Sequence, residues 1–216
     1  MILRTCPLRL ITSFAHRSTF GTDCIGEQSK YVWLPQYQEA KILLEKYLQD
    51  ITYIHHVIHS PSARGYLDEL YEGLEQQAAI KPGLTALFLS IFASTTFAWT
   101  PRDNESLFSS VEEANNQTTL WITTALAVLE FSHSTTSGSI EDIQAMIILS
   151  FAVCNVEGFS SRFWTLKSTA ISMARQLSLH RIDHVSSVPV ENMTDLSSTR
   201  VEIYRRVWWY LMATDW

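Results

Sequence analysis

Glycine and proline are scarce in this 216-residue chain, which has seven glycines and six prolines. Turn-rich β-sandwiches need these residues at their many turns, so their scarcity favours long helices. Charged residues are also few, at 18% of the chain, whereas 46% of the residues are hydrophobic and 12% are aromatic. So much apolar surface has to be buried, which argues against disorder over most of the chain. The length suits one large domain, or one domain with a leader.

Cysteine is scarce as well, and basic residues are outnumbered by acidic ones. Cys6, Cys24 and Cys154 lie far apart, and no two of them have the close spacing of a zinc or redox motif. An odd number of cysteines without a disulfide framework is typical of a reducing compartment. Cys154 lies in an apolar run, which predicts a buried side chain. The net charge is −6, whereas phosphate-binding domains usually carry a basic patch, so direct nucleic-acid binding is not predicted.

Acidic residues are absent from the first 22 positions, where Arg4, Arg9, His16 and Arg17 stand among serine, threonine and leucine. This composition is that of a mitochondrial transit peptide, and an unstructured leader is the alternative interpretation. We therefore expect residues 1–30 to be a disordered leader. A mitochondrial location would follow only if residues 1–22 were a transit peptide.

From Tyr31 onward, apolar residues recur at three- and four-residue intervals, the period of an amphipathic helix. The pattern predicts helices over residues 37–51, 63–79, 84–98, 120–131, 143–154, 163–177 and 201–211. Loops are predicted over residues 101–104, 134–138 and 185–198. Ser139 and Asp142 resemble a capping box before the fifth helix, and Gly158 marks its end. With no convincing strand and no tandem repeat, the predicted fold is all-α, with a multi-helix domain over residues 31–216.

The span between Pro82 and Pro101 contains no charged residue, and its length alone would suit a membrane helix. However, it holds six serines and threonines, and a proline closes each end. A helix that is apolar on all sides can be buried in protein as readily as in lipid. We therefore predict a buried core helix and no membrane partner.

Three histidines, His55, His56 and His59, form a pattern that resembles a metal site. His55 and His59 are four residues apart and would share one face of a helix. Zinc needs three or four ligands, and the hydrolase motif needs a glutamate between the two histidines, which this chain lacks. We therefore interpret His59, Ser60 and Pro61 as the end of a helix and predict no metal site.

The run His180-Arg181-Ile182-Asp183 is faintly similar to a kinase catalytic loop. Kinase chemistry also needs a glycine-rich loop, a strand lysine and an Asp-Phe-Gly motif, and the sequence has none of these. It also has no Gly-x-Ser-x-Gly, Walker or dinucleotide-binding motif. The sequence therefore predicts no catalytic residue and no cofactor-binding residue, and we expect that the protein is not an enzyme.

Arg200, Arg205 and Arg206 lie beside a Trp-Trp pair near the end of the chain. Basic residues next to aromatic ones are typical of nucleic-acid binding. However, Glu202 lies three and four residues before two of these arginines, so the group can neutralise itself on a helix. We predict a structural ion-pair cluster, with the first tryptophan in the core.

Several short motifs follow one another along the chain. The Trp-Leu-Pro run at 33–35 precedes an aromatic helix, and residues 57–61 form an apolar-His-x-Pro turn. A Leu/Phe/Ala-rich segment covers residues 84–93, and residues 139–150 form a helix in which Ile-Gln precedes Met-Ile-Ile-Leu. In this order, the motifs resemble the middle homology region of fungal zinc-cluster transcription factors.

The C-terminal half carries the more specific part of the resemblance. Trp164 precedes Ala-Ile-Ser-Met-Ala at 170–174 and Leu-Ser-Leu-His-Arg at 177–181, and Arg-Arg-Val-Trp-Trp follows at 205–209. The residues that resemble the family signature are His59, Pro61, Gln144, Trp164, Ala170, Met173, Leu179, His180, Arg181, Glu202, Arg205, Arg206, Trp208, Trp209 and Asp215. The chain departs from the family at Ser178, where glycine is usual, and at Ile182, where an acid is frequent. A left-handed helix cap at Ser178 would cost more than one at glycine.

The resemblance implies a nuclear regulator of transcription, of the kind that controls metabolic or secondary-metabolite gene clusters. The helical domain of such proteins is thought to sense a small molecule or to contact partners, here another transcription regulator or a second copy of the chain. The aromatic content suggests a cleft for a small apolar effector. Zinc is implied only for a six-cysteine DNA-binding module, which three cysteines cannot form. We therefore expect no cofactor here and only indirect contact with DNA.

Two other functions stay open. The first is a stand-alone interaction module that pairs with such regulators and inhibits them. The second is an enzyme or binding protein for a small apolar metabolite, which would need polar groups that converge in a pocket. The resemblance also implies that further helices follow residue 216, so we expect the domain to be incomplete at its C-terminus.

Overall fold

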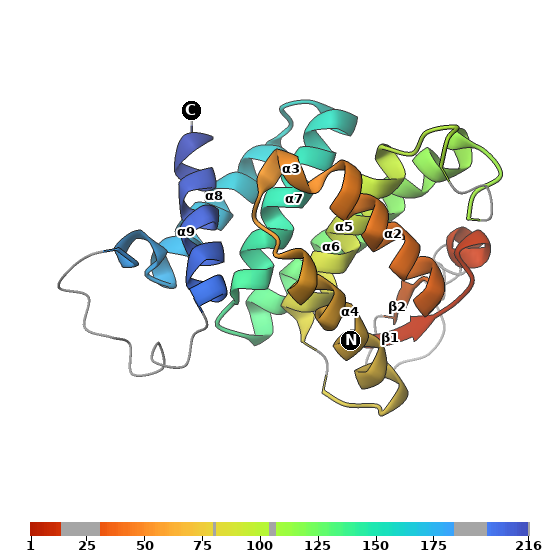
Figure 1. The fold of residues 1–216 in the computed structure, drawn as a ribbon, viewed down its shortest axis with the longest axis horizontal. Coiled ribbons are helices and arrows are strands. Elements are labelled where there is room, and N and C mark those ends of the chain that lie inside the picture. The colour runs from red at the N-terminus through yellow and green to blue at the C-terminus, as the bar shows by residue number, and fades with distance from the viewer. Residues whose placement is uncertain (14–30, 80, 104–106, 184–197, 216) are drawn as a thin grey trace, which may run out of the picture.

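The computed structural model describes residues 1–13, 31–79, 81–103, 107–183 and 198–215, and these are mostly helical (Figure 1). The elements in chain order are β1 (Ile2–Thr5), η1 (Leu8–Leu10), β2 (Tyr31–Leu34), α2 (Tyr37–Asp50), α3 (Thr52–His55), α4 (Ser60–Glu75), α5 (Pro82–Phe97), α6 (Val111–Thr135), α7 (Ile140–Glu157), α8 (Ser161–Gln176), η2 (Leu179–Arg181) and α9 (Ser198–Ala213). In Figure 1, α8 and α9 lie at the left of the molecule and the small sheet lies at the right. The predicted helical class is therefore confirmed, with one sheet added.

Helix α5 forms the centre of the core, because it packs against α2, α6 and α7. Every residue of α5 between its first and last positions is buried. Buried hydroxyls in α5 donate to carbonyls of the same helix, as Ser90 Oγ does to the Ala86 carbonyl at 2.8 Å. Such bonds allow a helix that contains serine and threonine to be buried on all sides. The prediction of a core helix is confirmed, and within the described ranges no helix is long and apolar enough to cross a membrane.

Helix α7 is also buried over most of its length, and its N-terminus closes against α5. Ser139 Oγ accepts from the Asp142 N–H at 3.3 Å, and Asp142 Oδ2 accepts from the Ser139 N–H at 2.8 Å. The predicted capping box is therefore present, and Gly158 ends the helix at a φ of 72°. A Cβ on Gly83 would lie 2.5 Å from Ser139 Oγ and 2.7 Å from Asp142 Oδ2. This close approach requires glycine at position 83.

The prediction of a disordered leader is wrong for residues 1–13. Strand β1 pairs in parallel with β2, with Leu3 opposite Val32. Leu8 and Ile11 are fully buried, and the Leu8 N–H donates to Glu39 Oε2 at 2.9 Å. Residues 14–30 lie outside the described residues. The expectation failed because the strand and the helical turn of this segment are too short to show a hydrophobic period in the sequence. The basic, serine-rich composition was the stronger signal and favoured a leader.

The prediction of a helix end at Pro61 is also wrong, because α4 begins at Ser60 with Pro61 in its first turn. Proline is tolerated there, since the N–H that it lacks would have no partner within the helix. The preceding helix α3 ends one turn earlier, where His56 adopts a left-handed conformation with φ at 54°. Cys154, predicted to be buried, is only partly buried. The predicted loop over residues 185–198 lies almost wholly outside the described residues.

Candidate functional site

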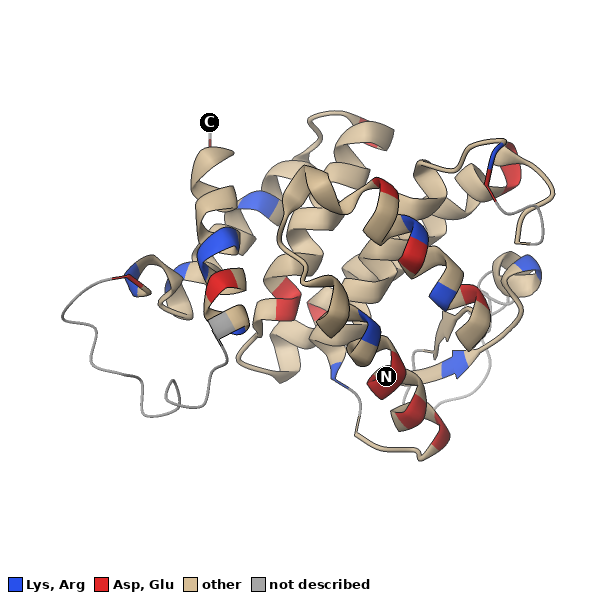
Figure 2. Ribbon diagram, in the orientation of Figure 1, with Lys and Arg blue, Asp and Glu red and all other residues tan. Residues whose placement is uncertain are grey.

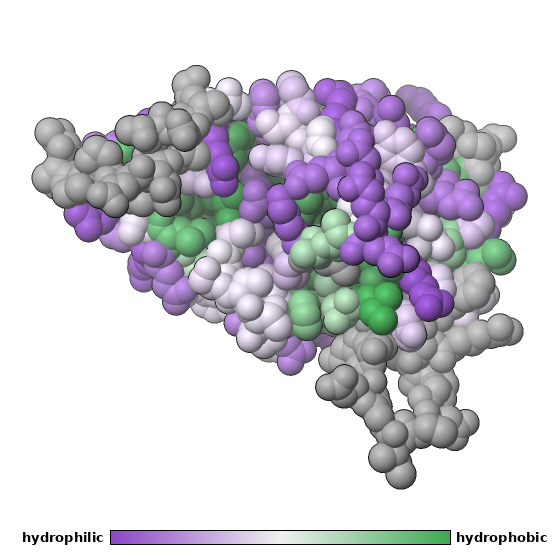
Figure 3. All heavy atoms as spheres, turned by 90° about the horizontal axis from the view of Figure 1, so that it is seen from below, coloured by the Kyte–Doolittle hydropathy of each residue, from purple (hydrophilic) through white to green (hydrophobic). Residues whose placement is uncertain are grey.

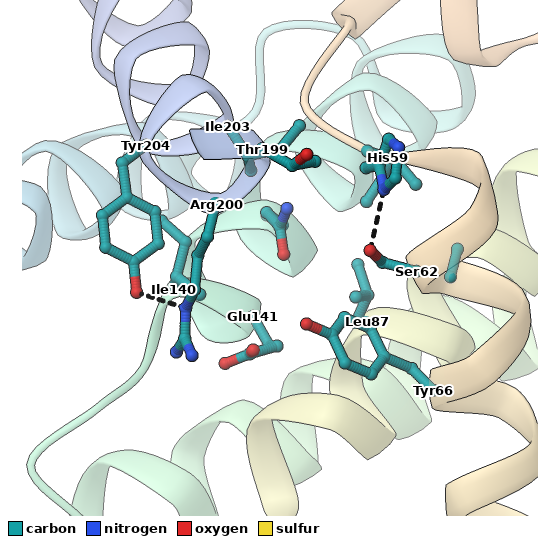
Figure 4. A pocket seen from close by; sticks show the side chains of 13 residues that line it. His59, Ser62, Tyr66, Leu87, Ile140, Glu141, Thr199, Arg200, Ile203 and Tyr204 are labelled. Carbon is teal, nitrogen blue, oxygen red and sulfur yellow. Dashed lines mark hydrogen bonds between the residues drawn. The ribbon is translucent and has the colours of Figure 1, made fainter. Parts of the chain in front are cut away.

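A cavity of about 270 Å³ lies where the N-terminal parts of α4, α7 and α9 meet over α5. Apolar side chains line part of it, including Ile58 before α4, Leu87 of α5 and Ile203 of α9. Polar side chains from three helices line the same space, and Figure 4 shows Tyr66 and Glu141 next to each other along one edge of it. The cavity therefore combines an apolar wall with groups that can donate or accept hydrogen bonds, which is typical of small-molecule sites.

Some of the polar groups around the cavity are fixed by neighbours. His59 Nδ1 and Ser62 Oγ lie 2.7 Å apart, at the start of α4. Gln144 Nε2 donates to the Val57 carbonyl at 2.6 Å, which ties α7 to the segment before α4. This bond uses the amide donor of a buried glutamine, so it orients the side chain that forms the cavity wall.

Arg200 supplies the positive charge at the cavity. Its Nε donates to the Tyr204 hydroxyl at 3.0 Å, and its guanidinium lies 5.7 Å from the centre of the Tyr204 ring. Burial acts to lower the pKa of Arg200, but the bond to Tyr204 and the charge of Glu141 outweigh it and raise the pKa above its usual value. A permanent cation therefore lies beside the Glu141 carboxylate at one edge of the space, as Figure 4 shows.

The ion pairs predicted near the end of the chain are present. Glu202 Oε2 accepts from Arg205 Nη1 at 2.6 Å, and Glu202 Oε1 accepts from Arg206 Nε at 2.9 Å. Arg205 also pairs with Asp183, which follows η2. The ring of His180 lies 5.8 Å from the ring of Trp208. These contacts join the two C-terminal motifs of the signature to each other.

The other signature residues occupy varied positions. His59 and Gln144 line the cavity, and Pro61 lies in the first turn of α4. Buried signature residues are Gln144, Ala170, Met173 and Leu179, and exposed ones are Pro61, Trp164, His180, Arg181, Arg206, Trp209 and Asp215. Trp208, predicted to lie in the core, is only partly buried, because Val207 and Leu211 face the core instead. Tryptophans at 164 and 209 therefore present aromatic surface to solvent.

The structure does not bring His55 and His59 onto one helix face. His55 ends α3 and is buried, whereas His59 precedes α4, and the left-handed turn at His56 separates them. Among the described residues, no group of three or more His, Cys, Asp or Glu side chains could hold a metal ion. Burial lowers the pKa of His55 to about 4, so this side chain is a neutral group packed against aromatic rings.

Sequence reasoning missed Tyr66, Glu141 and Tyr204 as members of one site. They belong to three helices that are far apart in the chain, and none of them stands in a recognisable motif. Glu141 lies in the first turn of α7. An acidic residue there is already explained by its favourable interaction with the helix dipole, so its presence does not indicate a binding site. Only the packing of α4, α7 and α9 reveals their common position.

Charged and apolar residues are distributed in different ways over the parts of the molecule that Figures 2 and 3 show. Lys and Arg are scattered among Asp and Glu in Figure 2, without a basic stripe along a helix. Figure 3, seen from below Figure 1, shows hydrophilic residues over most of that face and apolar residues in small separate patches. Among the described residues, the ribbon view in Figure 2 shows no run of Lys and Arg of the kind that a phosphate-binding domain carries.

Comparison with known proteins gives consistent results. The sequence profile of the fungal specific transcription factor domain matches residues 44–215. The probable transcription factor lepB of Aspergillus flavus is 45% identical over 96% of this chain, and transcription factor TAS2 of Pyricularia oryzae is 30% identical over 97%. The agnestins biosynthesis cluster transcription factor AgnL11 of Paecilomyces divaricatus is 27% identical over 85% of the chain. These relatives are described as transcription factors rather than enzymes.

The chain spans 36% of the length of lepB and 26% of the length of each of the other two relatives. No solved structure matches it. The matched profile covers the second half of α2 and every element from α3 to α9, and therefore includes the cavity and the ion-pair cluster. Because this profile matches far more than half of its residues, the chain belongs to the family of fungal specific transcription factor domains.

Proposed function

We propose that this chain is the regulatory domain of a fungal transcription regulator that acts in the nucleus and controls a metabolic or secondary-metabolite gene cluster. The observation that carries the proposal is the family match over residues 44–215. One relative at 27% identity is described as the transcription factor of a biosynthesis cluster. This description supports a biosynthetic gene cluster as the target in the proposal. The helical core would bind an effector or a partner and transmit the resulting conformational change to the rest of the regulator.

Contact with DNA is indirect in this proposal. The zinc of such regulators belongs to a six-cysteine module, and the three cysteines of this chain do not fit it. The net charge of −6 also opposes binding to phosphates. A gel shift with the purified chain should show no complex at physiological salt. A shift that survives this salt concentration would contradict indirect contact.

A second candidate function is an interaction module that pairs with other regulators or with a second copy of itself. The observation that favours it is an exposed aromatic cluster where α7 meets α8. Phe159 is 73% exposed and Trp164 is 48% exposed, and their rings stack with centroids 6.1 Å apart. Exposed aromatic residues that adjoin one another are frequent at protein-binding surfaces.

A reporter experiment tests the first function. The chain is fused to a heterologous DNA-binding module with an activation domain, and transcription is compared with the same fusion lacking the chain. We expect the chain to change the reporter level, and Phe88→Asp to abolish the change, because Phe88 is fully buried in the core. Equal reporter levels with and without the folded chain would contradict the regulatory function.

The second function needs a separate measurement. The untethered chain is expressed beside a tethered full-length regulator of the same family, and the reporter level is followed. The interaction module predicts inhibition that Phe159→Ser relieves, with His133→Ser as a control at an exposed site on α6. Inhibition that is the same with and without the exposed Phe159 ring would remove the aromatic cluster as the contact surface.

A further inference from the structure

The cavity between α4, α7 and α9 is built from segments that the chain brings together from a distance. Ser62 and Tyr66 come from α4, Glu141 from α7, and Thr199 from the first turn of α9. Its volume of about 270 Å³ is just below the usual range for ligand pockets. It therefore suits a compact molecule that would touch all three helices at once.

Two polar groups in the cavity have capacity for a ligand. Within the described part of the chain, the Tyr66 hydroxyl and the Glu141 carboxylate take part in no hydrogen bond and no ion pair, and both side chains are only partly buried. Figure 4 shows the Tyr66 hydroxyl directed into the space between the helices and the Glu141 carboxylate at its edge, on the side of Arg200. A carboxylate offers acceptors only, whereas a tyrosine hydroxyl offers a donor and an acceptor. The ligand therefore needs at least one hydroxyl or N–H donor.

The charges select a neutral ligand over an ion. The negative Glu141 and the positive Arg200 line the same space. An anion would be attracted by Arg200 and repelled by Glu141, and a cation would be attracted by Glu141 and repelled by Arg200. A neutral molecule that carries both a donor and a carbonyl acceptor matches both charges. The ring of Tyr66 at the edge of the space favours a planar molecule, because flat rings can stack or meet edge to face.

We propose that this cavity binds a compact, planar, uncharged molecule that donates a hydrogen bond to Glu141 and offers a carbonyl oxygen on the side of Arg200. Apolar contacts with Leu87 and Ile203 would supply the remaining affinity. This inference rests on the proposed regulatory function, since a bound molecule would act as its effector. It replaces the purely apolar effector expected from the aromatic content with one that carries a donor and an acceptor.

The position of the cavity gives the ligand a means of regulation. A molecule that contacts α4, α7 and α9 together would stabilise the arrangement in which α9 lies against the other two. The same helix carries the exposed Trp209 and the ion-pair residues Glu202 and Arg205. Ligand binding would therefore favour one position of α9. The size of the response depends on how much more tightly the ligand binds the chain with α9 in that position than in any other.

The test uses the purified 216-residue chain and 7-hydroxycoumarin, a planar molecule with one hydroxyl donor and one lactone carbonyl. Binding is followed by the fluorescence of the coumarin at a pH at which its hydroxyl is protonated. We expect saturable binding with a dissociation constant below about 1 mM. The matched compound 7-methoxycoumarin lacks the donor and should bind about tenfold more weakly or worse.

Two pairs of variants locate the binding. Glu141→Gln should weaken the binding of 7-hydroxycoumarin by about tenfold, because a hydrogen bond to a charged acceptor becomes a neutral one. Its control is Glu130→Gln, at an exposed position of α6. Thr199→Phe should abolish binding by filling the cavity from α9, and Thr165→Phe, at an exposed position of α8, should leave it unchanged.

The outcomes separate the inference from the proposed function. Three results would each overturn the cavity as the binding site, whatever the reporter shows. They are the absence of saturable binding, equal affinity for the two coumarins, and an affinity of Glu141→Gln and Thr199→Phe for 7-hydroxycoumarin equal to that of the parent chain. In the reporter fusion, 7-hydroxycoumarin should change the output of the parent chain and leave that of Thr199→Phe unchanged. A fusion in which the chain itself has no effect would instead refute the regulatory function, while coumarin binding to the purified chain would still stand.

Discussion

Arg205 of α9 binds Asp183, 22 residues earlier, through a forked contact. Arg205 Nη2 donates to Asp183 Oδ1 at 2.7 Å, and Arg205 Nε lies 3.0 Å from both carboxylate oxygens. The same guanidinium donates from Nη1 to Glu202. Only arginine has donors in a fixed planar arrangement that can serve two carboxylates at once. The contact therefore explains why the segment after η2 stays close to α9.

Replacing Arg205 with lysine should weaken this link without unfolding the chain. Hydrogen bonds from Arg205 hold the pKa of the Asp183 carboxyl below its usual range. The stability from this pair is therefore present above the ordinary aspartate pKa and is lost as pH falls through the lowered value. Both groups are well exposed, so the change in the thermal midpoint should be small at low salt and should vanish at high salt. Arg206→Lys, which affects only a contact within α9, is the control.

Ser178 lies between α8 and η2 with a left-handed φ of 59°, so Ser178→Gly should stabilise the chain. Glycine adopts this conformation without the clash that a Cβ causes, and the expected gain is about 1 kcal/mol. Ser172→Gly, in the interior of α8 at an exposed position, should instead cost about 0.5 kcal/mol. Urea unfolding of both variants measures the difference. A loss of stability at both positions would show that the φ at Ser178 carries no strain.

Gly83→Ala should destabilise the chain, although alanine is the better helix former. The new methyl group would lie within 3 Å of Ser139 Oγ and Asp142 Oδ2, in the capping box of α7. Overpacking of this kind costs about 1–3 kcal/mol, more than the helix propensity of alanine returns. Gly65→Ala is the matched control, because a Cβ there meets nothing within 4 Å. The free energy of unfolding of Gly65→Ala should rise by about 0.5–1 kcal/mol. Thermal unfolding of both variants and the parent chain measures the two changes.

The helices could be predicted from the sequence because their signals are local. Ser139 with Asp142 indicated the start of α7, Gly158 its end, and the uncharged span after Pro82 the buried α5. Pro61 misled the prediction because proline both follows helix ends and occupies first turns, and the sequence alone does not distinguish the two. Local patterns therefore located the elements better than their boundaries.

The small sheet and the cavity could not be predicted, because both depend on contacts between distant segments. Strands β1 and β2 have only four residues each and pair across a long gap in sequence, so neither shows a reliable alternation. Glu141 and Tyr66 belong to different helices and come to line one cavity only through packing. Ion pairs within α9 were predicted from their spacing, whereas the partner of Arg205 at Asp183 was not.

Leu8→Ala tests whether the N-terminal segment belongs to the folded domain. Leu8 is fully buried, its N–H donates to Glu39, and its carbonyl accepts from Gln117 Nε2 at 3.1 Å. Truncating a buried leucine should cost about 2–5 kcal/mol in the free energy of unfolding. Leu10→Ala, at a side chain that is 48% exposed, should change it by less than about 0.5 kcal/mol. Equal stability of the two variants would show that residues 1–13 do not pack as described.

His55 should make the chain less stable in acid. It is 2% exposed, and neither ring nitrogen has a hydrogen-bond partner among the residues that the structure describes. Its ring lies 5.2 Å from the ring of Phe151 and 5.6 Å from that of Tyr210. Burial lowers its pKa from 6.5 to about 4, so the unfolded chain takes up a proton at a higher pH than the folded chain does. Stability should therefore fall as pH drops from 6.5 toward 4, by about 3 kcal/mol in total, and should not depend on His55 above that range.

His55→Phe should remove this part of the pH dependence, because phenylalanine fills a similar space among the same rings and does not titrate. Urea unfolding at neutral pH and near pH 4 measures the effect, with His133→Phe as a control at an exposed site on α6. The variant should also be no less stable than the parent chain at neutral pH, since it removes two buried nitrogens without partners. A variant that loses stability at neutral pH would show instead that the His55 nitrogens are hydrogen-bonded in solution and that the ring is held by more than aromatic packing.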